Sequence, residues 1–380
     1  MKTNKTIVWV SPDPFLDTDL NYEVMSGILR EYNIHWIVLF DKKGNRYKES
    51  DFDRLRSEND NLTVEFLYSK HRKRYPQNIF YYLKINRIIK RVNPDCIYSN
   101  LVADSPWMIP FVYKLPKNKW INTAHQGAVH AGFKFQSINK FVRTIIYNRV
   151  LYINMFSKSQ ASLMKTNFPK AKIFQFVLGL KYFGKPSASR PDSNVIKFLS
   201  FGMINYGKNV ELLVDAACNL YEKGYRDFKV VIKGNCVDKD AFMKHVKYPE
   251  VIDADLRFID NSEIPDMFTG SHFFVQPYRI VTQSGPFKIA MNYNVPLITS
   301  NLPGFTDEMK EGVTGFIFKT EDVESLENVM IKAIEIAKDA DKYSNLCRNM
   351  KEYVDNTYST EALGKQYIDM FNDVIKSSQL

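Results

Sequence analysis

The sequence predicts an α/β protein with two successive domains, each built on a mostly parallel sheet that helices cover on both faces. The chain has 380 residues with 45% hydrophobic content, enough for two cores. Short apolar segments alternate with helical patterns through both halves. A stretch rich in Gly, Pro, Ser and Lys at 178–194 separates the halves. Ligands of such sheets bind beyond the carboxyl ends of the strands.

The first domain is expected at residues 1–185. Apolar segments predict strands at 6–10, 36–40, 62–68, 96–99, 120–123 and 152–156. Residues with helical periodicity predict helices at 20–31, 78–92 and 138–150. Strands and helices that alternate in this way form parallel sheets through crossover connections.

The second domain is expected at 195–358, after a linker at 186–194. Strands are predicted at 196–201, 229–233, 256–259, 272–276, 296–300 and 315–318. Helices are predicted at 323–338, 342–357 and 360–376.

The most informative segment follows the apolar strand that contains Phe273 and Phe274. A loop of small polar residues, Thr282-Gln283-Ser284-Gly285, comes next, and a helix begins at about Pro286. Such a helix start leaves backbone N–H groups free, and its dipole favours a phosphate. An ordinary strand-to-helix turn with a serine N-cap explains the same residues, and this alternative stays open.

Composition excludes several classes of protein. The four cysteines lie far apart and form no metal-binding spacing, so we expect reduced core thiols in a cytoplasmic protein. The N-terminus lacks the apolar stretch of a signal peptide, and no run of about 18 apolar residues predicts a membrane-spanning helix.

Charge is distributed unevenly along the chain. Residues 1–190 contain 31 Lys and Arg against 14 Asp and Glu, a net charge of +17, and the remainder carries −7. Basic segments rich in aromatic residues at 69–92 and 133–158 fit an anionic membrane surface. A solvated basic face over core helices fits equally, so peripheral attachment at the inner face of the cytoplasmic membrane stays open. We expect no nucleic-acid partner, because no RNA- or DNA-binding motif accompanies the basic segments.

Three segments of the second half resemble the nucleotide-sugar-binding domain of GT-B glycosyltransferases, most closely the family-4-like bacterial polysaccharide enzymes. Residues 201–220 resemble that family's glycine turn with a lysine before a helix, and Lys208 holds the lysine position. Residues 277–285 resemble its PYxxxTQSG loop. Residues 301–318 resemble its glycine, acidic residue and G-x-T-G ending.

A loop of the first half resembles the HD-x-x-PH-x-G segment of the acceptor-side domain in some of these enzymes. His125, Gly127 and His130 lie in it, while Gln126 and Val129 depart from the pattern.

The resemblance implies two Rossmann-like domains that face a cleft, with a C-terminal helix at about 360–380 crossing back to the first. It implies a metal-independent transferase that uses no cofactor beyond its nucleoside-diphosphate-sugar donor. The acceptor would be a glycan or lipid-linked glycan of polysaccharide biosynthesis in the cell envelope.

The resemblance also implies roles for individual residues. His125 and Lys208 would be catalytic, because fixed cations and donors stabilise the departing diphosphate. Asp307, Gly127 and His130 would contact the donor sugar or ribose. The diphosphate would be bound by Gly202, Asn205, Lys208, Thr282, Gln283, Ser284 and Gly285. The base would lie near Lys233, Gly234 and Asn261.

Two departures from the family's pattern leave alternatives open, and the first of them weakens the implied retention of anomeric configuration. Val281 and Ile289 stand where many relatives carry a pair of glutamates, and Met203 stands at a frequently basic position. We therefore look to Lys288 or Arg279 for a second cation. A non-catalytic subunit that binds a nucleotide sugar, or a sugar-nucleotide epimerase of the same fold, remains an alternative.

Overall fold

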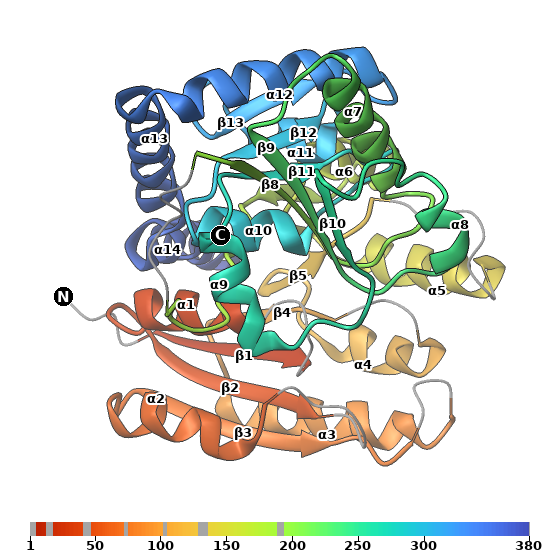
Figure 1. The fold of residues 1–380 in the computed structure, drawn as a ribbon. Helices are drawn as coiled ribbons and strands as arrows, with labels where there is room; N and C mark the ends of the chain where they lie inside the picture. The colour runs from red at the N-terminus through yellow and green to blue at the C-terminus, as the bar shows by residue number, and fades with distance from the viewer. Residues whose placement is uncertain are drawn as a thin grey trace. The chain divides into compact units, whose positions relative to one another are not determined.

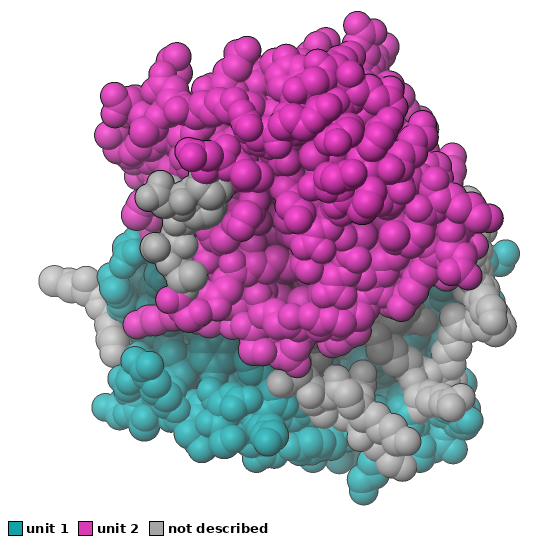
Figure 2. Space-filling view, viewed as in Figure 1, with its two compact units in different colours: residues 1–179, 360–380 teal, residues 180–359 magenta. Residues whose placement is uncertain are grey.

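A computed structural model describes residues 5–12, 18–40, 47–71, 75–101, 105–127, 136–187 and 194–379 (Figure 1). The chain forms two compact units, one of residues 1–179 and 360–380 and the other of residues 180–359 (Figure 2). Each unit holds one sheet in which all strand pairs are parallel. The predicted fold class, with two Rossmann-like parallel-sheet domains, is confirmed.

The sheet of unit 1 has seven strands in the order β3-β2-β1-β4-β5-β6-β7. Their bounds are β1 Thr6–Pro12, β2 Asn33–Phe40, β3 Leu62–Tyr68, β4 Cys96–Ser99, β5 Trp120–Ala124, β6 Tyr152–Met155 and β7 Lys172–Gln175. The α-helices are α1 Thr18–Ile28, α2 Asp53–Ser57, α3 Asn78–Val92, α4 Ile109–Lys114, α5 Gln136–Arg149, α6 Lys158–Asn167 and α14 Thr360–Gln379. Short 3-10 helices lie at Glu49–Phe52 and Pro106–Met108.

Unit 1 includes the last helix of the chain, α14, which packs against α1. A Cβ atom on Gly27 would lie 2.8 Å from Gly364 Cα, so the absence of side chains lets the two helix backbones approach closely. Thr360 Oγ1 donates a hydrogen bond to Glu23 at 2.7 Å, and Tyr32 donates to Asn372 at 2.9 Å. Helix α14 is therefore an integral part of the unit 1 core.

The sheet of unit 2 has six strands in the order β10-β9-β8-β11-β12-β13. Their bounds are β8 Ile196–Phe201, β9 Phe228–Lys233, β10 Ile252–Asp255, β11 Phe273–Gln276, β12 Leu297–Ser300 and β13 Gly315–Phe318. The α-helices are α7 Val210–Glu222, α8 Lys239–Met243, α9 Ile264–Thr269, α10 Gly285–Asn292, α11 Pro303–Thr306, α12 Val323–Lys338 and α13 Ala340–Tyr358. A 3-10 helix lies at Asn261–Glu263.

Two differences from the sequence expectation involve edge strands. The strand expected at 256–259 is wrong, because β10 lies at Ile252–Asp255 and alternates buried Ile252 with exposed Asp253. Strand β7 was not predicted, and it has no fully buried residue. Edge strands tolerate polar side chains, so neither segment has the continuous apolar pattern of a central strand.

The chain passes between the units earlier than the sequence suggests. Residues 180–185 and the described part of the expected linker belong to unit 2. The Phe183 N–H donates to Tyr293 Oη at 3.1 Å, and that hydroxyl donates to the Gly184 carbonyl at 2.9 Å. These contacts hold the segment against unit 2. Residues 188–193 lie outside the described residues.

The four cysteines, Cys96, Cys218, Cys236 and Cys347, are all buried and free, as predicted. Within the described residues, no helix is both long enough and apolar enough to span a bilayer.

Candidate functional site

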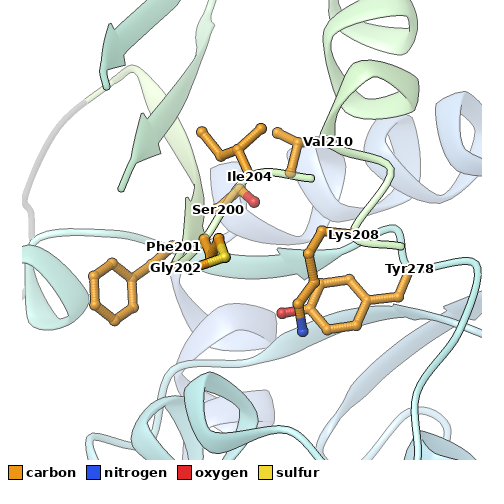
Figure 3. A pocket seen from close by; sticks show the side chains of 8 residues that line it. Ser200, Phe201, Gly202, Ile204, Lys208, Val210 and Tyr278 are labelled. Atoms are coloured by element: carbon orange, nitrogen blue, oxygen red, sulfur yellow. The ribbon is translucent and has the colours of Figure 1, made fainter. Parts of the chain in front are cut away.

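A pocket lies at the carboxyl edge of the unit 2 sheet, where strand order reverses. From β8 the chain continues to β9 on one side, and from β11 it continues to β12 on the other. The pocket is lined by the loop after β8, which includes Gly202 and Lys208, and by Tyr278 after β11 (Figure 3). Ligands of open parallel sheets bind at such a reversal.

Gly202 allows the loop after β8 to pass close to its neighbours. Its φ of +125° favours glycine, and its N–H donates to the Lys233 carbonyl at 3.0 Å. A Cβ atom on Gly202 would lie 3.6 Å from Pro286 Cγ. The loop therefore lies against the start of α10.

Asn205 shapes the turn that presents Lys208. The Lys208 N–H approaches both the Asn205 carbonyl, at 2.9 Å, and its side-chain oxygen, at 3.3 Å. Asn209 then takes a left-handed conformation, with φ of +50°, before α7 begins. The structure thus gives the Asn205 side-chain oxygen a role in the loop itself.

Lys208 places its ammonium group 3.8 Å from the centre of the Tyr278 ring (Figure 3). Burial of the group lowers its pKa from 10.5 to about 8. Within the described part of the chain, no carboxylate forms an ion pair with Lys208. A half-buried cation of this kind is suited to an anionic ligand.

The start of α10 forms another side of the site. Ser284 is the N-cap, and its hydroxyl accepts a hydrogen bond from the Phe287 N–H at 3.3 Å. Gln276, fully buried at the end of β11, donates to both Ser284 Oγ, at 2.6 Å, and Tyr278 Oη, at 2.8 Å. The expected diphosphate residues Thr282, Gln283 and Gly285 are half-buried beside this cap.

The cations suggested as substitutes are both engaged elsewhere. Lys288 is buried and pairs with Glu308, and its ammonium also lies 3.1 Å from Tyr358 Oη. Arg279 pairs with Glu321 at 2.8 Å. The expectation that either residue supplies a free second cation is therefore wrong.

Lys181 is a basic residue near the site that sequence reasoning missed. Its side chain is only 9% exposed, and its Cε atom would lie 3.6 Å from a Cβ atom on Gly285. It precedes the segment that Tyr293 holds against unit 2. No local motif marks this lysine, because its place beside α10 depends on tertiary contacts.

The structure places the expected sugar-binding acid at the end of α11. Asp307 is half-buried there, and its N–H donates to the Pro303 carbonyl at 3.1 Å. Gly304 packs closely on the preceding loop, since a Cβ atom there would lie 2.8 Å from the Val281 carbonyl oxygen. Ile289 is buried within α10.

The residues expected near the base lie farther along the same edge of the sheet. Lys233 is 3.5 Å from Asp255 and 3.7 Å from Asp253, so it belongs to a network of charges. A Cβ atom on Gly234 would lie only 1.9 Å from the Gly202 carbonyl oxygen. Asn261 is exposed at the start of a 3-10 helix.

The expected acceptor-side residues belong to unit 1. His125 follows β5, with its ring 5.4 Å from that of Phe156. The Gly127 N–H donates to the side chain of Gln160 at 2.9 Å, which joins this loop to α6. His130 lies outside the described residues.

Comparison with known proteins matches most of unit 2 to glycosyltransferases. Residues 185–356 match the family model described as glycosyl transferases group 1. Glycogen synthase of Thermodesulfovibrio yellowstonii is 24% identical over 187 residues, which cover 48% of this chain and 35% of the synthase. The Staphylococcus aureus capsular polysaccharide biosynthesis glycosyltransferase CapM is 24% identical over 194 residues, 50% of this chain and 48% of CapM. The matched region thus spans a third to a half of these curated relatives.

Solved structures resemble the chain over nearly its whole length. A glycosyltransferase of Rickettsia africae has a TM-score of 0.70 at 17% identity, covering 98% of this chain and 99% of that protein. Anabaena Alr3699/HepE in complex with UDP has a TM-score of 0.67 at 13% identity, covering 97% and 100%. The chain therefore has the GT-B fold, and the match to the glycosyl transferases group 1 model covers its residues 185–356.

Proposed function

We propose that the protein transfers a sugar from a nucleoside-diphosphate-sugar to a glycan or lipid-linked glycan acceptor in polysaccharide biosynthesis. The observation that carries this proposal is the position of Lys208 in a pocket at the strand reversal, beside the start of α10. A cation and a helix N-terminus both favour a diphosphate. The solved structure of HepE with UDP supports a uridine nucleotide as the first ligand to test.

Catalysis would come from charge held in place before the reaction. As the glycosidic bond breaks, negative charge grows on the leaving diphosphate, and Lys208 would stabilise that charge. Thr282, Gln283 and the first turn of α10 would hold phosphate oxygens, while His125 and Asp307 would act near the sugar. The proposal includes retention of anomeric configuration, as the sequence resemblance implies, and NMR of the product would determine the anomer.

A thermal-shift screen of UDP, GDP, ADP and CMP tests the donor site, with the Lys208→Ala variant in parallel. A ligand at 100 times its dissociation constant stabilises a protein by about 2.7 kcal/mol, which such a screen detects. We expect one nucleotide to raise the melting temperature of the wild type and not of the variant. No shift with any of the four would contradict the proposal.

A non-catalytic nucleotide-sugar-binding subunit is the second candidate. Val281 and buried Ile289 favour it, because both positions lack the carboxylates found in many relatives. Incubation of the protein with the radiolabelled sugar donor distinguishes the candidates, since a binding subunit retains the donor intact. We propose that turnover needs no metal, and we expect it to persist in EDTA.

We also propose a cytoplasmic protein that attaches peripherally to anionic membrane. Helix α5 contains no acidic residue, carries Lys140 and Arg143, and exposes Phe141 by 64%. An apolar side chain among basic ones suits the interface of an anionic bilayer. Co-sedimentation with vesicles of phosphatidylglycerol should be weakened by Phe141→Ser, and should disappear with neutral vesicles. Equal sedimentation of the wild type and the Phe141→Ser variant with phosphatidylglycerol vesicles would contradict this role for α5.

A further inference from the structure

We propose that the Tyr278 ring positions Lys208. The ring holds the ammonium group in the pocket against an aromatic face, so that no carboxylate neutralises its charge before a diphosphate binds. This inference rests on the proposed function, and it identifies Tyr278 as a positioning residue. The distance of 3.8 Å between Lys208 Nζ and the ring centre is the starting observation (Figure 3).

The ring is itself fixed from several directions. Tyr278 is only 3% exposed, and its hydroxyl accepts a hydrogen bond from Gln276 Nε2 at 2.8 Å. Its carbonyl accepts from Ser300 Oγ at 2.9 Å, and its ring lies 5.3 Å from that of Phe305. A side chain held in this way offers a rigid surface to the lysine.

Gln276 connects the Tyr278 ring to the start of α10. The same Nε2 atom that donates to Tyr278 also donates to Ser284 Oγ, the N-cap of α10. Gln276 is fully buried, and its Oε1 atom has no hydrogen-bond partner among the described residues. Burying an unsatisfied amide oxygen destabilises the fold, so the amide is retained at a cost. The two hydrogen bonds that Gln276 donates fix the Tyr278 ring relative to the start of α10.

Three other cations along the carboxyl edge of this sheet are held differently. Each of them is paired with a carboxylate: Arg279 with Glu321, Lys288 with Glu308, and Lys233 with Asp255. A carboxylate would compete with phosphate for the ammonium group, whereas an aromatic face attracts the cation without cancelling its charge. The distinction separates a cation available to a ligand from cations that stabilise loops.

Two neighbouring tyrosines provide a matched pair for testing the idea. Arg279 lies over the Tyr206 ring at 4.5 Å, and it also donates to the Tyr206 carbonyl at 2.8 Å. The loops after β8 and β11 thus exchange two cation–ring contacts, but only the one at Tyr278 involves a cation without a carboxylate partner in the described residues. Tyr206→Leu removes a ring from the same pair of loops and serves as the control.

The test measures UDP affinity by calorimetry at pH 7 and pH 9 in wild type, Tyr278→Phe, Tyr278→Leu and Tyr206→Leu. We expect Tyr278→Phe, which keeps the ring, to bind within about twofold of wild type. Tyr278→Leu should bind about five- to tenfold more weakly at pH 7. Its affinity should also change differently between pH 7 and pH 9, because the ring both attracts the ammonium group and shields it from water. Tyr206→Leu should keep the wild-type pH profile.

A measurement without ligand guards against a folding defect. The titration of Lys208, followed by NMR of lysine labelled at Cε, should shift in Tyr278→Leu and stay in place in Tyr278→Phe. Wild-type affinity and pH profile in Tyr278→Leu would overturn the inference alone. Equal losses in the Phe and Leu variants would overturn it too, since the hydroxyl would then be responsible. Failure of the wild type to bind UDP, GDP, ADP or CMP would instead overturn the proposed function.

Discussion

The affinity for nucleotide should depend on pH through Lys208. Burial lowers the pKa of Lys208 to about 8, so the ammonium form predominates at pH 7 and is the minor form at pH 9. The protonated fraction falls from about 0.9 to about 0.1 across this range. If the diphosphate binds the protonated form alone, its affinity should fall about tenfold, or about 1.4 kcal/mol.

The sign of the effect follows from which form the ligand stabilises. A bound diphosphate favours the ammonium ion and raises its pKa, so binding near pH 8 should take up a proton. Calorimetry in two buffers with different enthalpies of ionisation measures that uptake directly. Most of the second ionisation of a phosphate group, with a pKa near about 6, is complete by pH 7 and adds little.

A matched control isolates the lysine. Lys208→Arg keeps its charge through pH 9, so its affinity should be nearly constant over the range in which wild type loses about tenfold. Wild-type affinity that is unchanged between pH 7 and pH 9, with UDP clearly bound, would refute the reasoning. The diphosphate would then be held by groups other than a lysine that titrates near pH 8.

The lowered pKa of Lys208 also makes the stability of the unliganded protein depend on pH, but stability should rise with pH where the affinity for nucleotide falls. The ammonium form is destabilised by burial, and this cost is fully present below about pH 8 and is relieved as the pH rises towards 10.5. Lys208→Met should therefore raise the melting temperature while removing nucleotide binding. Because part of the side chain reaches water, we expect a gain of about 1 kcal/mol, or roughly 2–4 °C. A lower melting temperature in urea-free buffer would contradict this account.

Three further substitutions test packing and charge. Gly364→Ala should destabilise unit 1 by about 1–3 kcal/mol in urea unfolding, because its Cβ would lie 2.8 Å from Gly27 Cα; a neutral result would mean that α14 shifts freely on α1. Glu308→Ala should cost about 3–5 kcal/mol, since it leaves buried Lys288 without its partner, and restoring stability with a second change of Lys288 to Met is the check. Lys181→Met should weaken UDP binding several-fold with little change in melting temperature, as its stem packs beside the first residue of α10; unchanged affinity would remove it from the site.

The sequence predicted elements well where periodicity and burial agree. Helices α3 and α12 and strands β3 and β8 lie at the predicted residues, because apolar side chains recur there at regular helical or strand spacing. Strands β7 and β10 were missed or misplaced, since each has only four residues and carries exposed charged side chains, whereas the seven-residue edge strand β3 was found.

Prediction of the site was limited in a similar way. Lys208 and the loop ending at Gly285 were found because a local motif marks them. The contact between Lys208 and the Tyr278 ring and the position of Lys181 were not predicted. Each depends on residues that tertiary folding brings together. Sequence reasoning likewise could not show that Lys288 is buried against Glu308, twenty residues away.

The packing of α14 on α1 has a consequence for the order of folding during synthesis. Unit 2 is continuous and is complete in the chain once Ser359 has been added, whereas unit 1 still lacks the helix that covers α1. At about 5–20 residues per second, the 20 residues of α14 take a further one to four seconds or so to translate. During that interval, helix α14 does not yet cover the face of α1 that includes Val24 and Ile28. Unit 1, whose strands precede unit 2 in the chain, is therefore the later of the two units to finish folding.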